Sequence, residues 1–153
     1  MTHHDIPSEP AGEVYLSLLE FAEQQDARFS LVWRQQTPLG AGAYALKRVL
    51  RPFMERQVRT DEWPGTRLIG HTAMVRTYRL VPAATRVLAE AGRLFAWRAP
   101  ERPEDLAFYS ADGRCWLVSI AHERQAYVTL DDAGLAALRA AVPGLLRAVK
   151  STR

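Results

Sequence analysis

The clearest pattern of apolar and polar positions in the chain predicts a hairpin. Leu106–Tyr109 is apolar and aromatic, and the dipeptide Asp112-Gly113 separates it from a second apolar run, Cys115–Ala121. Asp-Gly favours a tight turn because glycine adopts positive φ without steric cost. Both alternating faces of the second run are apolar, which is typical of a strand buried on both sides. We therefore predict an antiparallel pair in which Cys115–Ala121 is central in its sheet, with Trp116, Val118 and Ile120 on one face.

Two segments in the first half of the chain have helical spacing. Apolar residues recur every three or four positions over about 9–26, with Ser8 as a candidate N-cap and Pro10 in the first turn. A similar pattern covers 43–58, but Pro52 interrupts it. Proline lacks an N–H group and clashes with the preceding turn, so we expect a kinked helix or two short helices there.

Two further helices are expected later in the chain. A short helix follows Pro82 and ends near Gly92. Asp131 or Asp132 is placed to cap a last helix, whose apolar stripe extends to Val149. Pro143-Gly144 interrupts the stripe and is expected to kink the helix or to end its first half.

Other segments predict strands. Arg28–Arg34 alternates between apolar and polar residues, 67–80 is rich in β-branched and aromatic residues, and Ala126–Leu130 can add a short strand. A turn is expected at 63–66, where proline and glycine are adjacent. Residues 1–7 show no pattern and are expected to be frayed. Together these segments predict an α+β fold, with a mainly antiparallel sheet of four to five strands flanked by N- and C-terminal helices.

Length and composition indicate one domain over 1–153, because 153 residues can bury a sizeable core. We expect no signal peptide and no transmembrane segment, since no apolar run approaches the roughly 18 residues that span a bilayer. The single cysteine, Cys115, fits a reducing cytoplasm. Only Lys47 and Lys150 of the 20 basic residues are lysines, and this preference for arginine suggests a bacterium with a GC-rich genome.

The charges are unevenly distributed. The first 27 residues carry six acids and no lysine or arginine, whereas residues 28–99 carry 13 basic and four acidic residues. Either the acidic first helix lies against the basic middle segment, or a basic surface stays free for an acidic partner.

Candidate catalytic residues form two adjacent pairs, His122-Glu123 and Glu104-Asp105. Histidine with a carboxylate supports general acid–base catalysis, so a small hydrolase is one alternative function. The competing interpretation is structural: a histidine at a strand end, and an aspartate that closes a turn on its own backbone. His71 could join these residues as a metal ligand, but nothing in the spacing requires it. We expect no metal and no cofactor.

Candidate binding residues lie in the basic segment 47–59. Its cations are Lys47, Arg48, Arg51, Arg56 and Arg59, and Trp63 follows as a candidate aromatic anchor. Such a segment can contact an acidic protein surface, where Trp and Arg often dominate affinity, or nucleic-acid phosphates from one helical side. The structural alternative is a solvated helix face.

No catalytic or nucleotide-binding motif accompanies these residues. The function that we predict is therefore a non-catalytic protein-binding domain of the bacterial cytoplasm, a monomer or homodimer that masks an acidic partner as immunity proteins and antitoxins do. This prediction rests on analogy between small charged α+β domains. A hydrolase and a nucleic-acid-binding protein remain the alternatives.

Overall fold

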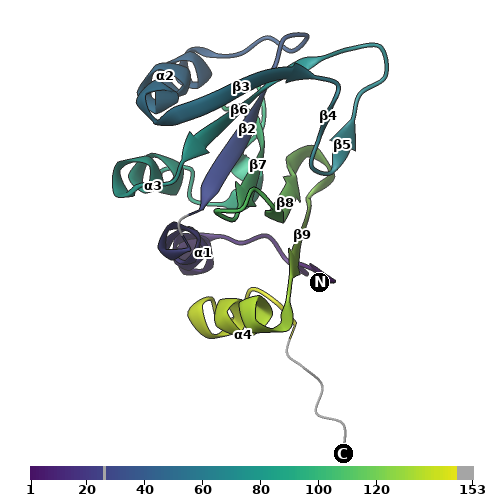
Figure 1. The fold of residues 1–153 in the computed structure, drawn as a ribbon. Helices are drawn as coiled ribbons and strands as arrows, with labels where there is room; N and C mark the ends of the chain where they lie inside the picture. Colours follow the sequence, from purple (N-terminus) through teal and green to yellow (C-terminus); the bar gives the residue numbers. More distant parts are fainter. Residues whose placement is uncertain (26, 148–153) are drawn as a thin grey trace, which may run out of the picture.

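The computed structural model describes residues 1–25 and 27–147, which form one large sheet with helices on one face (Figure 1). The strands of this sheet are β1 (Thr2–Asp5), β2 (Arg28–Arg34), β3 (Met54–Thr60), β6 (Ala73–Arg79), β7 (Glu104–Tyr109), β8 (Cys115–Ile120) and β9 (Gln125–Leu130). They pair antiparallel in the order β1-β9-β8-β7-β2-β6-β3. The α+β prediction is confirmed, but the sheet has seven strands rather than four to five.

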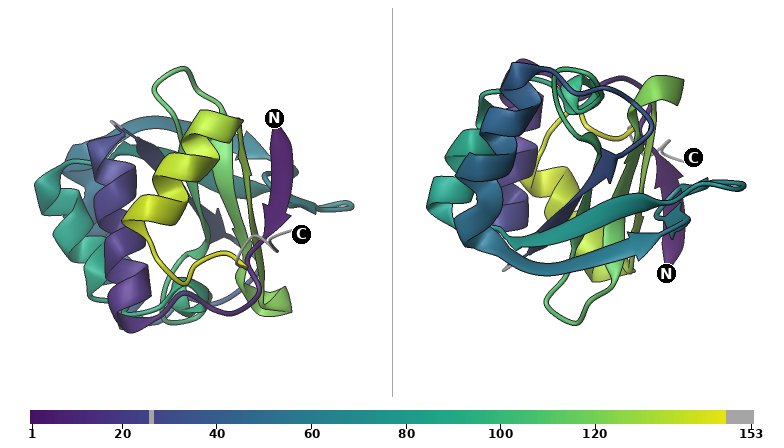
Figure 2. Two further views of the ribbon diagram at one scale, coloured as in Figure 1. Left: turned by 90° about the horizontal axis from the view of Figure 1, so that it is seen from below. Right: turned by 90° about the horizontal axis from the view of Figure 1, so that it is seen from above.

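The helices lie in a row along one face of the sheet (Figures 1 and 2). They are α1 (Gly12–Gln24), α2 (Ala41–Leu50), α3 (Pro82–Ala89) and α4 (Asp132–Ala141), with short 3₁₀ turns η1 (Arg51–Phe53), η2 (Leu94–Ala96) and η3 (Ala121–Glu123). The first helix packs between α3 and α4, and α2 lies at the β3 end of the row. Their apolar sides and the facing side of the sheet bury the main core, which includes Tyr15, Leu18, Phe29 and Phe108.

The opposite face carries a small hairpin, β4 (Glu62–Trp63) and β5 (Thr66–Arg67). The turn predicted at 63–66 joins its strands, which were not predicted. Beneath it, Trp63 packs with Val32 and Ala73 in a second apolar cluster. Gly65 in its turn has φ +88° and lies so close to β8 that an added Cβ would be 2.8 Å from Val118. The hairpin is therefore seated directly on the sheet.

The predicted central pair is confirmed as β7 and β8. One detail of the prediction is wrong: Trp116 does not share a face with Val118 and Ile120. The register shifts between Tyr109↔Cys115 and Phe108↔Leu117, so Trp116 occupies an irregular position and stacks on Phe108 at 5.6 Å on the helix side. Such a bulge re-aims a side chain without ending the strand.

The expected kinked helix over 43–58 is wrong in its second half. The helix α2 ends at Leu50, η1 contains Pro52, and the chain continues as the edge strand β3. Pro52 has no N–H group to continue the helical hydrogen bonds of α2. The residues after it are mostly polar on both faces, which suits an edge strand.

Two other boundaries differ from the sequence prediction. Residues 1–7 are not frayed throughout, because β1 pairs with β9 and His3 stacks on Tyr127 at 4.4 Å. The strand expected over 67–80 begins only at Ala73, since a loop follows β5.

The helix ends were predicted with mixed success. The Asp131 side chain accepts a hydrogen bond from the Gly134 amide at 2.7 Å and so caps α4, as predicted. Ser8 is not an N-cap, because α1 begins after Ala11, which gives no side-chain cap. Asp26 and Val149, at the ends of two predicted apolar patterns, lie outside the described residues.

Candidate functional site

A cationic cleft of about 460 Å³ opens between α2, the loop after β2 and the strands β6 and β3. Arg34, Lys47 and Arg76 line it, together with Tyr44 and Trp33, and no carboxylate is among its lining residues. We call this site the basic cleft. The local sequence explains its charge, because no Asp or Glu occurs between residues 26 and 55.

The aromatic residues of the basic cleft differ in exposure. Trp33 is buried and its indole Nε1 donates to the Tyr78 hydroxyl at 3.0 Å, while the Lys47 ammonium lies 5.8 Å from the centre of the Trp33 ring. Burial raises the pKa of the Tyr78 phenol, so this hydroxyl stays protonated. Tyr44 is 49% exposed, so its ring and hydroxyl are accessible at the edge of the cleft.

The outer side of α2 extends the cationic surface. Tyr44 and Arg48 are four positions apart on α2, and Arg51 follows at its C-cap, the first residue of η1, with a helical backbone (φ −52°, ψ −41°). This spacing places the three on one side. Both arginines are exposed, and no hydrogen bond or ion pair joins their side chains to any described residue. We call the basic cleft together with these residues and Arg59 the basic face.

The structure divides the basic segment 47–59 between two sides of the sheet. On β3, Gln57 and Arg59 pair with Arg76 and Met74, which line the basic cleft. Arg56 alternates with them and points to the opposite, helix-free face, where it lines a second cleft. The idea that Arg56 and Arg59 act from one helical side is therefore wrong.

The acidic N-terminal segment does not cover the basic face. The helix α1 packs against α3 and α4. Glu9 accepts a hydrogen bond from the Phe95 amide at 3.1 Å and lies near Arg93 and Arg124, while Glu23 accepts one from Thr85. Glu9 and Glu23 are thus engaged away from the basic face.

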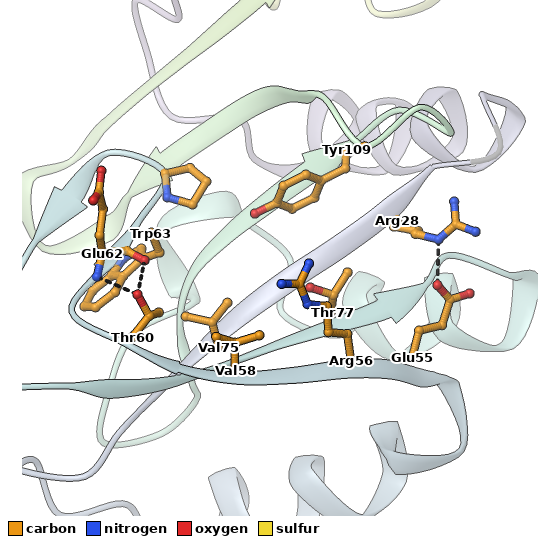
Figure 3. Close-up of a pocket in the computed structure, with 12 residues that line it drawn as sticks. Arg28, Glu55, Arg56, Val58, Thr60, Glu62, Trp63, Val75, Thr77 and Tyr109 are labelled. Carbon is orange, nitrogen blue, oxygen red and sulfur yellow. Dashed lines mark hydrogen bonds and ion pairs between the residues drawn. The ribbon is translucent and has the colours of Figure 1, made fainter.

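The second cleft, of about 370 Å³, lies on the helix-free face between the sheet and the β4–β5 hairpin (Figure 3). Val58 and Val75 lie on its floor, Trp63 and Tyr109 contribute its aromatic walls, and Arg56 lies at one end. We call it the hairpin cleft. Trp63 is only 5% exposed, so its predicted role as an exposed anchor is wrong, and it forms a wall instead.

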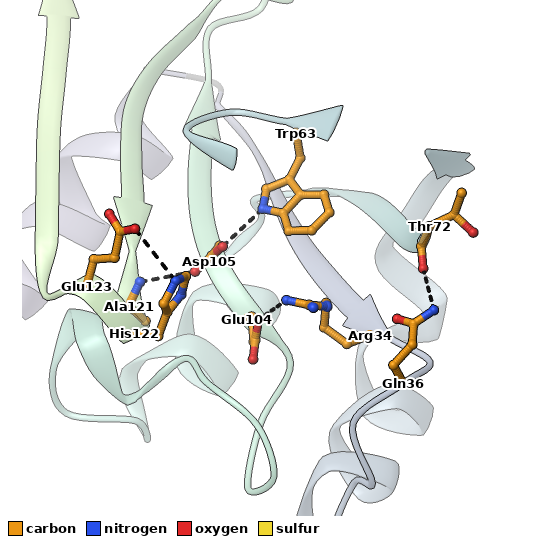
Figure 4. Close-up of polar contacts among 9 residues, drawn as sticks. All are labelled: Arg34, Gln36, Trp63, Thr72, Glu104, Asp105, Ala121, His122 and Glu123. Carbon is orange, nitrogen blue, oxygen red and sulfur yellow. Dashed lines mark hydrogen bonds and ion pairs between the residues drawn. The ribbon is translucent and has the colours of Figure 1, made fainter. Parts of the chain in front are cut away.

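Asp105 fixes the hairpin to the sheet (Figure 4). Its carboxylate, in a residue only 2% exposed, accepts hydrogen bonds from the Trp63 indole and the Ala121 amide, both at 3.0 Å. Burial raises the pKa of this carboxyl group, and the two N–H donors oppose that effect. Asp105 also has a left-handed backbone, with φ +59°, which aspartate tolerates better than most residues.

The other candidate catalytic residues are engaged separately. Glu104 lies 3.4 Å from Arg34, whose guanidinium carbon is 5.8 Å from the centre of the Trp63 ring. His122 and Glu123 form a 3.8 Å contact in η3, and both side chains are about half exposed. The strand β8 ends before them, and the 3₁₀ turn η3 lets the side chains of these adjacent residues meet. Asp105 does not join them, because each of its carboxylate oxygens already accepts a hydrogen bond from an N–H group.

Metal and thiol chemistry have little support in the described parts of the chain. Residues 1–25 and 27–147 contain no group of three or more His, Cys, Asp or Glu side chains that could hold a metal ion. Burial raises the pKa of the Cys115 thiol to about 12, which disfavours the reactive thiolate. Among the same residues, no helix has the length and hydropathy needed to cross a membrane.

Sequence reasoning missed several residues of both clefts. Trp33 and Arg76 reach the basic cleft from the strands β2 and β6, and Tyr109 reaches the hairpin cleft from the strand β7. Tyr44 could have been predicted from the sequence, because it lies four positions before Arg48 in a helical pattern without acidic residues and so shares an exposed helix side with it. Comparison with known proteins finds no match among family models, curated proteins or solved structures.

Proposed function

We propose that this protein is a non-catalytic binding protein that masks an acidic surface of another protein with its basic face. The observation that carries the proposal is the basic cleft, where Lys47 and Arg76 line a cavity without a carboxylate beside the exposed Tyr44. The third lining cation, Arg34, contacts Glu104 outside the cleft. A surface rich in cations attracts an acidic surface over several ångströms and accelerates association.

The composition of the basic face supports a protein partner. Tyrosine and arginine are enriched among the residues that dominate protein–protein affinity, because they combine apolar area with directional hydrogen bonds. Tyr44, Arg48 and Arg51 supply such groups on the outer side of α2, and Val49 beside them is 51% exposed. Exposed apolar area between the charged side chains favours a protein partner over a nucleic-acid backbone, which offers mainly phosphates.

Nucleic acid is the competing partner, and the test must separate the two. The tagged protein is used to capture partners from extract of its own cells, with and without nuclease, at low and at high salt. We expect one stoichiometric protein that resists nuclease and is retained at high salt. Nucleic acid captured only at low salt would contradict the proposal, because phosphate contacts weaken steeply with salt.

A further inference from the structure

We propose that the hairpin cleft is a second, separate binding site, which takes a small organic anion with an aromatic ring system. This inference does not depend on the proposed function, because the hairpin cleft and the basic face lie on opposite sides of the sheet. It rests on the shape of the cleft, the distribution of its charges and the way its walls are fixed.

The shape suits a small molecule rather than a protein surface. Its volume of about 370 Å³ falls within the range of roughly 300–1,000 Å³ that is usual for ligand pockets. An open face of an antiparallel sheet is ordinarily polar, yet Val58 and Val75 lie at the floor of this one. A flat ring on these valines, between Trp63 and Tyr109, would bury apolar area on several sides.

The charges favour an anion at one end. Arg56 points into the cleft in Figure 3, and no hydrogen bond or ion pair joins its side chain to any described residue. Arg28 lies beside it and forms a 2.7 Å ion pair with Glu55, which also lines this end of the cleft. Two arginines and one carboxylate leave this end with a net positive charge. The carboxylate of Glu62 is at the far end of the cleft from both arginines (Figure 3). A bound anion is therefore attracted to the Arg56 end and repelled from the other, which gives the ligand one orientation.

The walls are held in place without a ligand. The Trp63 indole donates a hydrogen bond to the buried Asp105 carboxylate. Gly65, which has no side chain, lets the turn of the hairpin pack directly on β8. On the other side, the Tyr109 hydroxyl lies 3.0 Å from the Ser30 hydroxyl. A site with fixed walls loses little conformational entropy on binding, so it can hold a small ligand with useful affinity.

The test uses two probes with the same rings and different charge. One is 8-anilinonaphthalene-1-sulfonate, an aromatic anion whose fluorescence increases in apolar sites, and the other is its uncharged analogue N-phenyl-1-naphthylamine. Affinity and stoichiometry are measured for the wild-type protein and for Arg56→Gln, Thr77→Phe and Arg86→Gln. Thr77 lines the hairpin cleft, so phenylalanine there fills it. Arg86 is an exposed arginine on α3 that lines neither cleft, so its variant is the control for the loss of one positive charge.

We expect one sulfonate molecule to bind per chain, with higher affinity than the neutral analogue. Arg56→Gln should weaken sulfonate binding about tenfold and leave the neutral probe unaffected, as expected for the loss of one charge-assisted contact. Thr77→Phe should abolish binding of both probes, and Arg86→Gln should change neither. Circular dichroism checks that each variant is folded. Absence of saturable sulfonate binding, or an equal loss in the Arg56 and Arg86 variants, would overturn the proposal.

Discussion

The hydrogen bond from the Trp63 indole to Asp105 is the most informative contact to perturb, because it fixes the β4–β5 hairpin, which forms one wall of the hairpin cleft. Asp105→Asn preserves the size of the side chain and its tolerance of a left-handed backbone, which the φ of +59° requires. The remaining amide oxygen can still accept the hydrogen bond of the Ala121 amide. Its NH₂ group then faces the Trp63 indole N–H, so two donors oppose each other in a buried site.

The expected cost follows from the stranded donor. Leaving a buried N–H without an acceptor costs about 1–3 kcal/mol, so we expect Asp105→Asn to lower the free energy of unfolding by ~2 kcal/mol. Removing the desolvation cost of the carboxylate works in the opposite direction, since burial raises the pKa of Asp105. In a Trp63→Phe background no indole donor remains, and the same substitution should cost less than about 1 kcal/mol.

Urea unfolding at neutral pH, followed by far-ultraviolet circular dichroism, measures all four members of this cycle. With a denaturant slope of roughly 2 kcal/mol/M, Asp105→Asn alone should lower the midpoint by about 1 M without changing the slope. Equal costs in the wild-type and Trp63→Phe backgrounds would refute the reasoning, as would an Asp105→Asn variant that is more stable than the wild type. Either result would mean that Asp105 does not fix the hairpin through the indole.

Three further predictions concern stability. Gly65→Ala should lower the free energy of unfolding in urea by about 3 kcal/mol, because its Cβ would lie 2.8 Å from a β8 side chain and its φ is +88°. Gly113 has the same φ but open space around it, so Gly113→Ala should lower this free energy by only about 1 kcal/mol. The raised pKa of Asp105 means that the folded protein holds this proton more tightly than the unfolded chain. The stabilisation that comes from this tighter proton binding is therefore full below the ordinary pKa of Asp105, 3.8, and is lost as the pH rises through the raised pKa. Over that pH range, the free energy of unfolding of the wild type should fall relative to that of Asp105→Asn. Asp131→Ala should cost about 1 kcal/mol by removing the cap on the Gly134 amide, and an unchanged urea midpoint would contradict that role.

Local patterns predicted most of the fold because they act over a few residues. The Asp112-Gly113 turn, the apolar run of β8 and the Asp131 cap each depend on neighbours in sequence, and each appears where it was expected. The segment after Pro52 was mispredicted because its polar residues Glu55, Arg56, Gln57 and Arg59 suit an exposed helix side as well as an exposed edge strand. Only pairing with β6, which is distant in sequence, selects the strand.

The candidate sites were less predictable for the same reason. Sequence reasoning named Lys47, Arg48, Arg51 and Arg59 of the basic face but missed Arg34 and Arg76. It grouped Arg56 with Arg59 because it predicted a helix there, whereas residues three apart on the strand β3 point to opposite faces. Trp63 was expected to be exposed, but a buried carboxylate from β7 holds its indole. Such long-range partners leave no mark in the local pattern of residues.

The central claim is that an acidic protein surface binds the basic face, and one capture experiment tests it most directly. The partner recovered from cell extract is quantified for the wild type, for Arg48→Glu with Arg51→Glu, and for a control, Arg67→Glu with Arg86→Glu. The control changes the net charge equally at exposed arginines on β5 and α3. We expect the first variant to lower partner recovery by about tenfold or more at the same salt, since reversed charges repel an acidic surface, and the control to retain it. Equal recovery by both variants would contradict the account.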